Sequence, residues 1–434
     1  MMNRLKHVVT ALAALAALTA CGNNGDSANP PTGGLQAAPG DGIVTVTWTD
    51  DLSVDYWLFV STDPTMTVDN FATRTDIRVL RSVRSPFTLC GYPDGRTLYL
   101  AMNGRTGGGP GGPGTPTINS TVRAAGSTWT AGTAPAVDFS DVGYAPITSC
   151  LSTGLPTGIY AAVGPGAAIA SSTDGLTFTA RAAPAGFATD LNAVATFTAN
   201  LNVPTSPGIK IIAVGTGGAS VVSTDGVTWT TGVAFDATAP TLRAIALNAG
   251  TFIAVGDGGA AQTTADGIAW TTHTSNTTAN LQGIGCSGTT CIAVGDGGTI
   301  VRTTDSGTTW TVQPITGTPA LKRVAYGNFN NNLGSVTASI NTWVAIGDAG
   351  AVLFSTDNGA TWTATTVPGA ANFTALSYLT RFVAIDSAGN AFFSQDGQTW
   401  TAPVATGLAG PRGVTGNGIG FVAVGAGGQT ASTF

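Results

Sequence analysis

The amino-acid sequence predicts an all-β protein. Its 434 residues include 60 glycines, and they are 43% hydrophobic but only 9% charged. This composition is typical of short strands joined by tight turns. Beyond the first twenty residues, no window shows the 3.6-residue hydrophobic periodicity of a helix. Short apolar strands instead recur at intervals of about forty residues, which indicates a repeat architecture.

The first twenty residues predict an export signal. Arg4 and Lys6 precede an apolar run, Val8 to Ala17, that is too short to span a bilayer. Leu18 to Cys21 resembles the bacterial lipobox, in which the cysteine is acylated and begins the mature chain. The alternative is ordinary cleavage with Cys21 unmodified. Residues 21–34 are rich in Asn, Gly and Pro, as in a flexible tether.

A lipidated Cys21 would place the protein in the bacterial cell envelope, with the anchor as its only membrane contact. Gly22 rather than Asp follows the cysteine, which resembles sorting to the outer membrane, periplasmic or surface-exposed. The net charge is −6 and all 23 acidic residues are aspartates. We therefore expect no nucleic-acid partner, since such proteins present a strongly basic surface.

Residues 35–125 predict a first β-domain. Alternating strands are expected at residues 43–48, 56–60 and 97–102. The segment resembles a fibronectin type III sandwich, with Trp48 at the position of the buried second-strand tryptophan and residues 92–99 matching the turn and tyrosine corner. The Gly/Pro-rich run from 107 to 116 replaces part of the last hairpin.

Four arginines lie within eleven residues of this segment: Arg74, Arg78, Arg81 and Arg84. They could bind an anionic partner, such as a lipopolysaccharide phosphate or an acidic polysaccharide. The alternative is an exposed edge strand that its charges protect from aggregation, and we favour this interpretation.

Internal repetition dominates residues 126–434. Seven copies of an apolar strand end in Val-Gly or a close variant, at residues 162–164, 213–215, 254–256, 293–295, 345–347, 384–386 and 423–425. Six are followed by a Ser/Thr-x-Asp-(x)-Gly-x-Thr-Trp-like motif, at residues 172–178, 223–229, 264–270, 303–310, 355–362 and 394–400. We expect the Asp and Ser/Thr side chains of the motif to accept hydrogen bonds from backbone N–H groups of the turn. Its Gly is expected to adopt a positive φ, and its aromatic residue is expected to pack on the sheet.

These motifs resemble Asp boxes, also called bacterial neuraminidase repeats, found in sialidases and in the propellers of photosystem II assembly factors. The resemblance implies a seven-bladed β-propeller. The seventh strand copy reaches Phe434 without its motif, whereas Ser127-Thr128-Trp129-Thr130 carries the same Thr-Trp-Thr ending. We therefore expect this segment to supply the outer strand of the last blade as a velcro closure.

Two blades carry insertions of about a dozen residues between their first and second strands. Such insertions form surface loops. They lie around residues 200–209 and 328–341. The second insertion is polar and rich in turn residues, so it is either a specific contact loop or the product of neutral drift.

Four cysteines remain besides Cys21, and an exported protein can keep them oxidised. Cys286 and Cys291 flank four residues between two strands, a spacing that suits a bridge across a hairpin. Cys150 has no close neighbour in sequence, which leaves Cys90 as its only other candidate partner, and the sequence does not decide whether these two cysteines pair. No CxxC pattern is present, and we predict no metal site.

Catalytic patterns are missing from the sequence. Sialidases use a Tyr activated by a Glu, and this chain contains no Glu. A Ser/His/Asp site would need His273, which is expected in a solvated loop between blades. Walker, Rossmann and EF-hand patterns are absent. We therefore predict a protein that is not an enzyme and has no cofactor.

With catalysis excluded, the function that the sequence favours is binding at the central channel of the propeller. The first strand of each blade begins at the channel mouth, where the aligned residues are Ala145, Asn192, Arg243, Gln282, Lys322, Thr374 and Arg412. Three are basic, and Asp257, Asp296 and Asp348 are expected nearby. In the photosystem II factors a basic patch is implicated in binding partner protein. We expect a protein partner of unknown identity, in an assembly or scaffold role, with surface glycan binding or adhesion as the alternative and glycoside hydrolysis the least favoured.

Overall fold

The computed structural model of the chain describes residues 27–40, 43–90, 92, 95–107, 110–123, 128–147, 157–199, 208–234, 236–313, 315, 317–329, 340–365, 367 and 369–434. Several predictions fall outside the described residues: the signal segment 1–20, Cys21, Cys150 and most of both insertions. Tertiary contacts divide the chain into two compact units, one of Met1–Ala38, Thr45–Phe87 and Thr97–Thr121, the other of Pro39–Val44, Thr88–Arg96 and Val122–Phe434. Within the described part, no helix is long and apolar enough to span a membrane.

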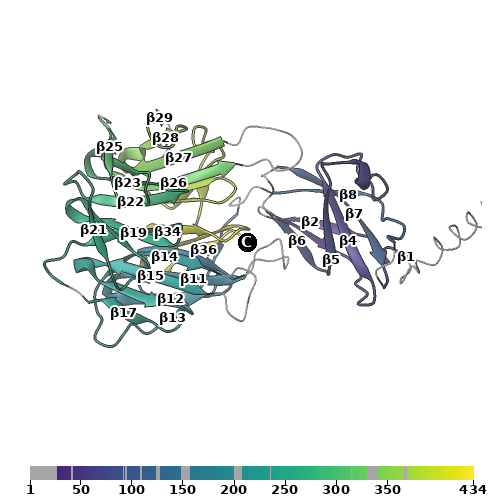
Figure 1. Cartoon of the computed structure of the whole chain (residues 1–434), viewed down its shortest axis with the longest axis horizontal. Coiled ribbons are helices and arrows are strands. Elements are labelled where there is room, and N and C mark those ends of the chain that lie inside the picture. Colours follow the sequence, from purple (N-terminus) through teal and green to yellow (C-terminus); the bar gives the residue numbers. More distant parts are fainter. Residues whose placement is uncertain are drawn as a thin grey trace, which may run out of the picture. The chain divides into compact units, whose positions relative to one another are not determined.

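Two sheets occupy the described residues between 27 and 121 (Figure 1). A five-stranded antiparallel sheet has the order β1-β7-β4-β5, with β8 also paired to β7; a second sheet has the order β2-β3-β6. The strands are β1 (Ser27–Ala28), β2 (Gln36–Gly40), β3 (Ile43–Thr47), β4 (Asp55–Ser61), β5 (Arg78–Val83), β6 (Phe87–Cys90), β7 (Thr97–Arg105) and β8 (Ile118–Thr121), with a 3-10 turn η1 (Phe71–Thr73).

Alternation of apolar residues explains these strands, because successive side chains point to opposite faces. Val44 and Val46 of β3 and Leu58 and Val60 of β4 are fully buried. The strands predicted at 43–48, 56–60 and 97–102 are present. One expectation is corrected: residues 27 and 28, assigned to the flexible tether, form strand β1 and pair with β7.

Seven four-stranded antiparallel sheets make up the described residues after 128. The first three consist of β10 (Asp141–Pro146), β11 (Gly158–Gly164), β12 (Ala168–Ser172) and β13 (Thr179–Ala180); β14 (Leu191–Thr198), β15 (Ile209–Gly215), β16 (Ser220–Ser223) and β17 (Thr230–Val233); and β18 (Leu242–Asn248), β19 (Thr251–Gly256), β20 (Ala260–Thr264) and β21 (Thr271–Thr274).

The other four sheets repeat this arrangement. They consist of β22 (Leu281–Ser287), β23 (Thr290–Gly295), β24 (Ile300–Thr303) and β25 (Thr311–Gln313); β26 (Leu321–Phe329), β27 (Ile340–Gly347), β28 (Val352–Ser355) and β29 (Thr363–Thr365); β30 (Phe373–Tyr378), β31 (Phe382–Asp386), β32 (Asn390–Ser394) and β33 (Val404–Ala405); and β34 (Pro411–Gly416), β35 (Phe421–Gly425), β36 (Thr430–Ser432) and β9 (Thr130–Ala131).

A short 3-10 turn joins the second and third strands in six of the seven sheets that the structure describes. These turns are η2 (Pro165–Ala167), η3 (Thr216–Gly218), η4 (Asp257–Gly259), η5 (Asp296–Gly298), η6 (Asp348–Gly350) and η7 (Ala426–Gly428).

The seven sheets form a closed ring. The first strand of each sheet contacts the first strand of the next, from β10 through β14, β18, β22, β26 and β30 to β34, and β34 contacts β10. β9, which precedes all the other strands of the ring in sequence, completes the last sheet by pairing Thr130 with Ser432 and Ala131 with Ala431. This pairing is the closure that the sequence predicts, and it makes the unit a β-propeller.

Each repeated Asp motif holds a turn between the third and fourth strands of its sheet. In the first, the Ser172 hydroxyl accepts the N–H of Gly175, and Asp174 Oδ1 accepts the N–H groups of Leu176 and Thr177 at 2.8 and 2.7 Å. The other five motifs repeat this pattern around Asp225, Asp266, Asp305, Asp357 and Asp396. The predicted structural role of the motif is therefore confirmed.

The hairpin of β22 and β23 carries a disulfide between Cys286 and Cys291, which face each other in the strand register. Cys90 is also disulfide-bonded, and Cys150, its candidate partner, lies outside the described residues. His273 was expected in a loop but lies in the outer strand β21, where its Nε2 is 2.8 Å from the Thr263 hydroxyl.

Candidate binding site at the mouth of the central channel

Six first strands of the ring carry a β-bulge after their first residue, and the extra residue lines the channel. The register of β22 against β23, for example, pairs Leu281 with Gly295 and then Gly283 with Val294, which leaves Gln282 outside the ladder. A bulge re-aims the side chain of its extra residue. The extra residues are Asn192, Arg243, Gln282, Lys322, Thr374 and Arg412.

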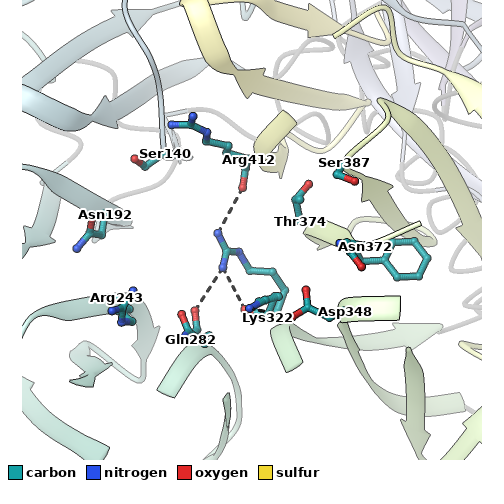
Figure 2. A pocket seen from close by; sticks show the side chains of 12 residues that line it. Ser140, Asn192, Arg243, Gln282, Lys322, Asp348, Asn372, Thr374, Ser387 and Arg412 are labelled. Carbon is teal, nitrogen blue, oxygen red and sulfur yellow. Dashed lines mark hydrogen bonds and ion pairs between the residues drawn. The ribbon is translucent and has the colours of Figure 1, made fainter. Parts of the chain in front are cut away.

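These side chains surround a cavity of about 410 Å³, which we call the mouth cavity (Figure 2). Its wall is formed by residues of six sheets and by Ser140, which directly precedes the first strand of the remaining sheet. The lining residues are Ser140, Asn192, Arg243, Gln282, Lys322, Arg323, Asp348, Asn372, Phe373, Thr374, Ser387 and Arg412. The structure thus brings together all five residues that the sequence assigns to partner binding.

One of the aligned positions was wrong. Ala145 is fully buried in the core between the first two sheets, and Ser140 lines the cavity in its place. The first sheet begins one residue after Ser140, at Asp141, whereas the sequence alignment placed the strand start later. The fully buried Phe139 before Ser140 could have marked the correct start, because a buried apolar residue such as Leu191 precedes the bulge residue in the other sheets.

Each of the three basic bulge residues is paired with an aspartate. Arg243 forms an ion pair with Asp257, Lys322 with Asp348 at 3.2 Å, and Arg412 with Asp138 at 3.0 Å. Asp257 and Asp348 begin the 3-10 turns η4 and η6. In the fourth sheet the bulge residue is the uncharged Gln282, whose side-chain amide donates a hydrogen bond to Asp296 of η5 at 2.9 Å. The mouth is therefore a ring of mixed charge and not a cluster of unpaired cations.

Arg323, which also lines the cavity, donates hydrogen bonds across the ring, a role that was not predicted from the sequence. Its Nη1 donates to the carbonyl oxygens of Gln282 at 3.3 Å and Lys322 at 3.0 Å, and its Nη2 donates to that of Arg412 at 3.4 Å (dashed lines in Figure 2). One guanidinium thus bridges the fourth, fifth and seventh sheets. Nothing in the sequence distinguishes Arg323 from a solvated strand residue, because the bulge at Lys322 decides where it points.

Asp141 of β10 is the acidic group that acts on Arg323. Burial raises the pKa of Asp141, while the charge of Arg323 and the N–H of Val194, which donates to its carboxylate at 3.0 Å, oppose that rise. Burial likewise lowers the pKa of Arg323, and Asp141 opposes that change. Opposite charges in the channel therefore offset part of each other's desolvation cost.

A second, larger cavity of about 830 Å³ lies on the third sheet. It is lined by η4, by strand β21 with His273, and by residues 275–278. Among the described residues, no group of three His, Cys, Asp or Glu side chains could hold a metal ion. The His273 ring is hydrogen-bonded to the Thr263 hydroxyl. Among the described residues, no carboxylate forms a hydrogen bond with this ring.

No protein-family model matches the chain, and no curated protein matches it. Solved structures do. YCF48 bound to D1 peptide superposes with a TM-score of 0.54 at 18% identity, covering 70% of this chain and 96% of that chain. The WD40 β-propeller domain of Doa1 gives 0.51 at 9% identity over 70% and 94% of the two chains. YCF48 from Cyanidioschyzon merolae gives 0.50 at 15% identity over 71% and 98%. At these identities the likeness concerns the fold alone, and it shows that this chain contains a β-propeller.

Proposed function

We propose that this chain is a lipid-anchored protein of the bacterial envelope whose seven-bladed, Asp-box propeller binds a protein partner at the mouth cavity. In this proposal residues 35–125 form a fibronectin type III-like spacer, and the protein is a non-catalytic assembly or scaffold factor. The observation that carries the proposal is the set of bulges, which aim one side chain from each of six sheets into a single cavity.

The chemistry of the mouth suits a polypeptide. Three neutral amides lie between the charged pairs, and each uses only part of its hydrogen-bonding capacity within the protein. The Asn192 amide donates to Leu242 O, and that of Gln282 donates to Asp296, while Asn372 accepts the N–H of Ala349. The carbonyl oxygens of Asn192 and Gln282 and the amide nitrogen of Asn372 can therefore pair with a backbone N–H and C=O of a bound loop.

The paired charges favour a partner that carries charges of both signs. An acidic side chain of the partner can replace an aspartate beside Arg243 or Arg412, and a basic one can bind the aspartate so released. Both arginines are about two-fifths exposed, so their ion pairs each contribute at most about 1 kcal/mol to stability. The exchange therefore costs little. YCF48, a propeller of similar fold, is known in complex with a peptide, which supports a polypeptide ligand.

The test is a triple substitution, Arg243→Gln with Lys322→Gln and Arg412→Gln, compared with a control that removes the same charge elsewhere on the propeller. The control is Arg181→Gln with Lys210→Gln and Arg302→Gln, whose side chains bond to Ser171, Ala265 and Asn358. Both proteins should melt within a few degrees of the wild type. Pull-downs from the native envelope should lose the partner only with the mouth variant.

Two outcomes would redirect the proposal. If the folded mouth variant recovers the same partners at the same salt concentration, the binding surface lies elsewhere. If the wild-type chain binds a glycan array and the mouth variant does not, the ligand is a surface glycan and not a protein.

The anchor has a separate test. Cys21→Ser should move the protein from the membrane fraction to the soluble fraction, because a serine cannot carry the thioether-linked lipid. Unchanged fractionation would contradict lipidation at Cys21.

A further inference from the structure

Two arginines lie over the ring of Trp57 on one face of the five-stranded sheet. The Cζ atom of Arg105, at the end of β7, is 3.3 Å from the ring centroid, and that of Arg81, in β5, is 4.4 Å away. The Trp57 ring is itself fixed, since its Nε1 donates to Asp55 at 3.0 Å. Stacking on an indole is a favourable arrangement for a guanidinium, and it leaves the in-plane N–H donors directed away from the ring.

Neither of these guanidinium groups forms an ion pair with a carboxylate in the described part of the chain, although Asp55 faces Arg105 in the strand register. Two nearby arginines differ in this respect: Arg74 pairs with Asp63 and Asp76, and Arg84 pairs with Asp50 at 3.5 Å. Arg81 is exposed, and the Nε of Arg105 is buried without a hydrogen-bond partner. The stack therefore holds donors that the sandwich itself does not use.

The electrostatics of the stack favour an anion. Burial lowers the pKa of Arg105, and the charge of Arg81 lowers it further, while Asp55 opposes both. Two cations and one carboxylate leave a net positive charge at this point. An arriving oxyanion would relieve the repulsion between the two guanidinium groups and accept hydrogen bonds from the exposed Arg81.

The strand register places this stack beside the start of the mature chain. Ser27 of β1 pairs with Arg105 of β7. Five residues, 22 to 26, separate Cys21 from Ser27, and the six steps between their Cα atoms span at most about 20 Å when extended. A lipid on Cys21 would therefore hold the backbone of Arg105, one strand spacing beyond Ser27, within about 25 Å of the membrane surface.

We propose that Arg81, Trp57 and Arg105 form a binding site for the phosphate groups of anionic phospholipids, which orients the anchored protein on its membrane. The choice of a membrane as the source of phosphate rests on the proposed lipidation of Cys21. A guanidinium presents parallel N–H donors that match two phosphate oxygens, and an arginine near an anionic bilayer strengthens association about five-fold.

The experiment uses the Cys21→Ser chain, so that its result is independent of whether Cys21 is acylated. Binding is measured by co-sedimentation with vesicles of phosphatidylcholine alone or with phosphatidylglycerol, at low and high salt. We expect association with the phosphatidylglycerol vesicles at low salt only. Arg81→Gln should weaken it about five-fold, and Arg81→Gln with Arg105→Gln about 25-fold. Arg181→Gln with Arg302→Gln removes the same charge from the propeller and should leave binding within two-fold.

Arg105 is partly buried, so the melting temperature of the double variant is measured first; the exposed Arg81→Gln alone keeps the test valid if the double variant unfolds. Equal binding to both kinds of vesicle, or unchanged binding by Arg81→Gln, would overturn the proposal. The proposal would also be overturned if the chain bound immobilised dextran sulfate through Arg81 but did not bind phosphatidylglycerol vesicles. The ligand would then be a soluble polyanion.

Discussion

The glycine of each Asp motif is constrained by the neighbouring sheet as well as by its own turn. Gly226 has φ +70°, and a Cβ atom there would lie 2.5 Å from Cγ2 of Ile159 in the preceding sheet. Gly166, in the turn η2, has φ +62°, but a Cβ atom added there would meet no other atom within 4 Å. The two glycines share a left-handed backbone and differ in the space beside them.

We therefore predict that Gly226→Ala is more destabilising than Gly166→Ala. The left-handed conformation alone costs an alanine about 1 kcal/mol, and the overlap with Ile159 adds about 1 to 3 kcal/mol. Ala349 already occupies the position of η6 that matches Gly166, with φ +55°. Denaturant unfolding of both variants measures the difference, and equal losses would mean that the contact between sheets is readily relaxed.

Acid should weaken the Asp motifs. The hydroxyl of Thr309, followed by its N–H and the hydroxyl of Thr303, lowers the pKa of Asp305 to about 2 from the ordinary 3.8. Its stabilising effect is complete above the ordinary pKa and is lost as the pH falls toward 2, because the unfolded chain takes up the proton first. Asp305→Asn retains an acceptor without a charge, so its unfolding free energy should fall less between pH 4 and pH 2. Parallel curves for variant and wild type would contradict this assignment.

Among the elements, the two-residue strand β9 has an effect beyond its size. Its residues lie about three hundred positions before their partners in β36, so their pairing joins the two ends of the ring. Trp129 beside it packs on the core of the last two sheets. The strand β33 occupies the same outer position in the sixth sheet, but it follows β32 directly in the chain.

Proline substitution separates these two cases. Thr130→Pro with Ala131→Pro removes N–H donors from β9, and Val404→Pro with Ala405→Pro does the same in β33. We expect the β9 variant to have the lower melting temperature, because it also releases the ring closure. Thermal unfolding followed by circular dichroism compares the two, and similar melting temperatures would indicate that contacts between first strands suffice to close the ring.

Across the whole propeller, Arg323 connects sheets that are not neighbours in the ring. Its guanidinium donates to carbonyl oxygens in the fourth, fifth and seventh sheets, and Asp141 in the first sheet balances its charge. Removing Arg323 takes away these three hydrogen bonds, for which a charged donor is worth about 1.5 to 3 kcal/mol each at most, and also the opposite charge that offsets part of the desolvation cost of Asp141.

Arg323→Leu should accordingly lower the unfolding free energy by about 3 kcal/mol, because the hydrogen bonds from its guanidinium to carbonyl oxygens are lost. Adding Asp141→Ala should recover part of that loss, since the remaining carboxylate is then removed as well. A double-mutant cycle by urea unfolding measures this coupling. Strictly additive losses would show that the two charges act independently.

The sequence alone determined the repeat, the turn motifs, the closing strand and five residues of the mouth. The turn motifs depend on neighbours a few positions away, such as the hydroxyl and carboxylate that bond a turn, and so each copy displays them. The closing strand and the mouth residues were found by aligning these copies, because one copy lacks its motif and the strand starts fall at equivalent positions. Only the tertiary structure showed that Arg243, Lys322 and Arg412 are paired, that Ser140 replaces Ala145, and that Arg323 donates hydrogen bonds across the ring. The ring decides these contacts because a bulge turns a side chain out of its alternating order and because groups in different sheets meet only when the ring is closed.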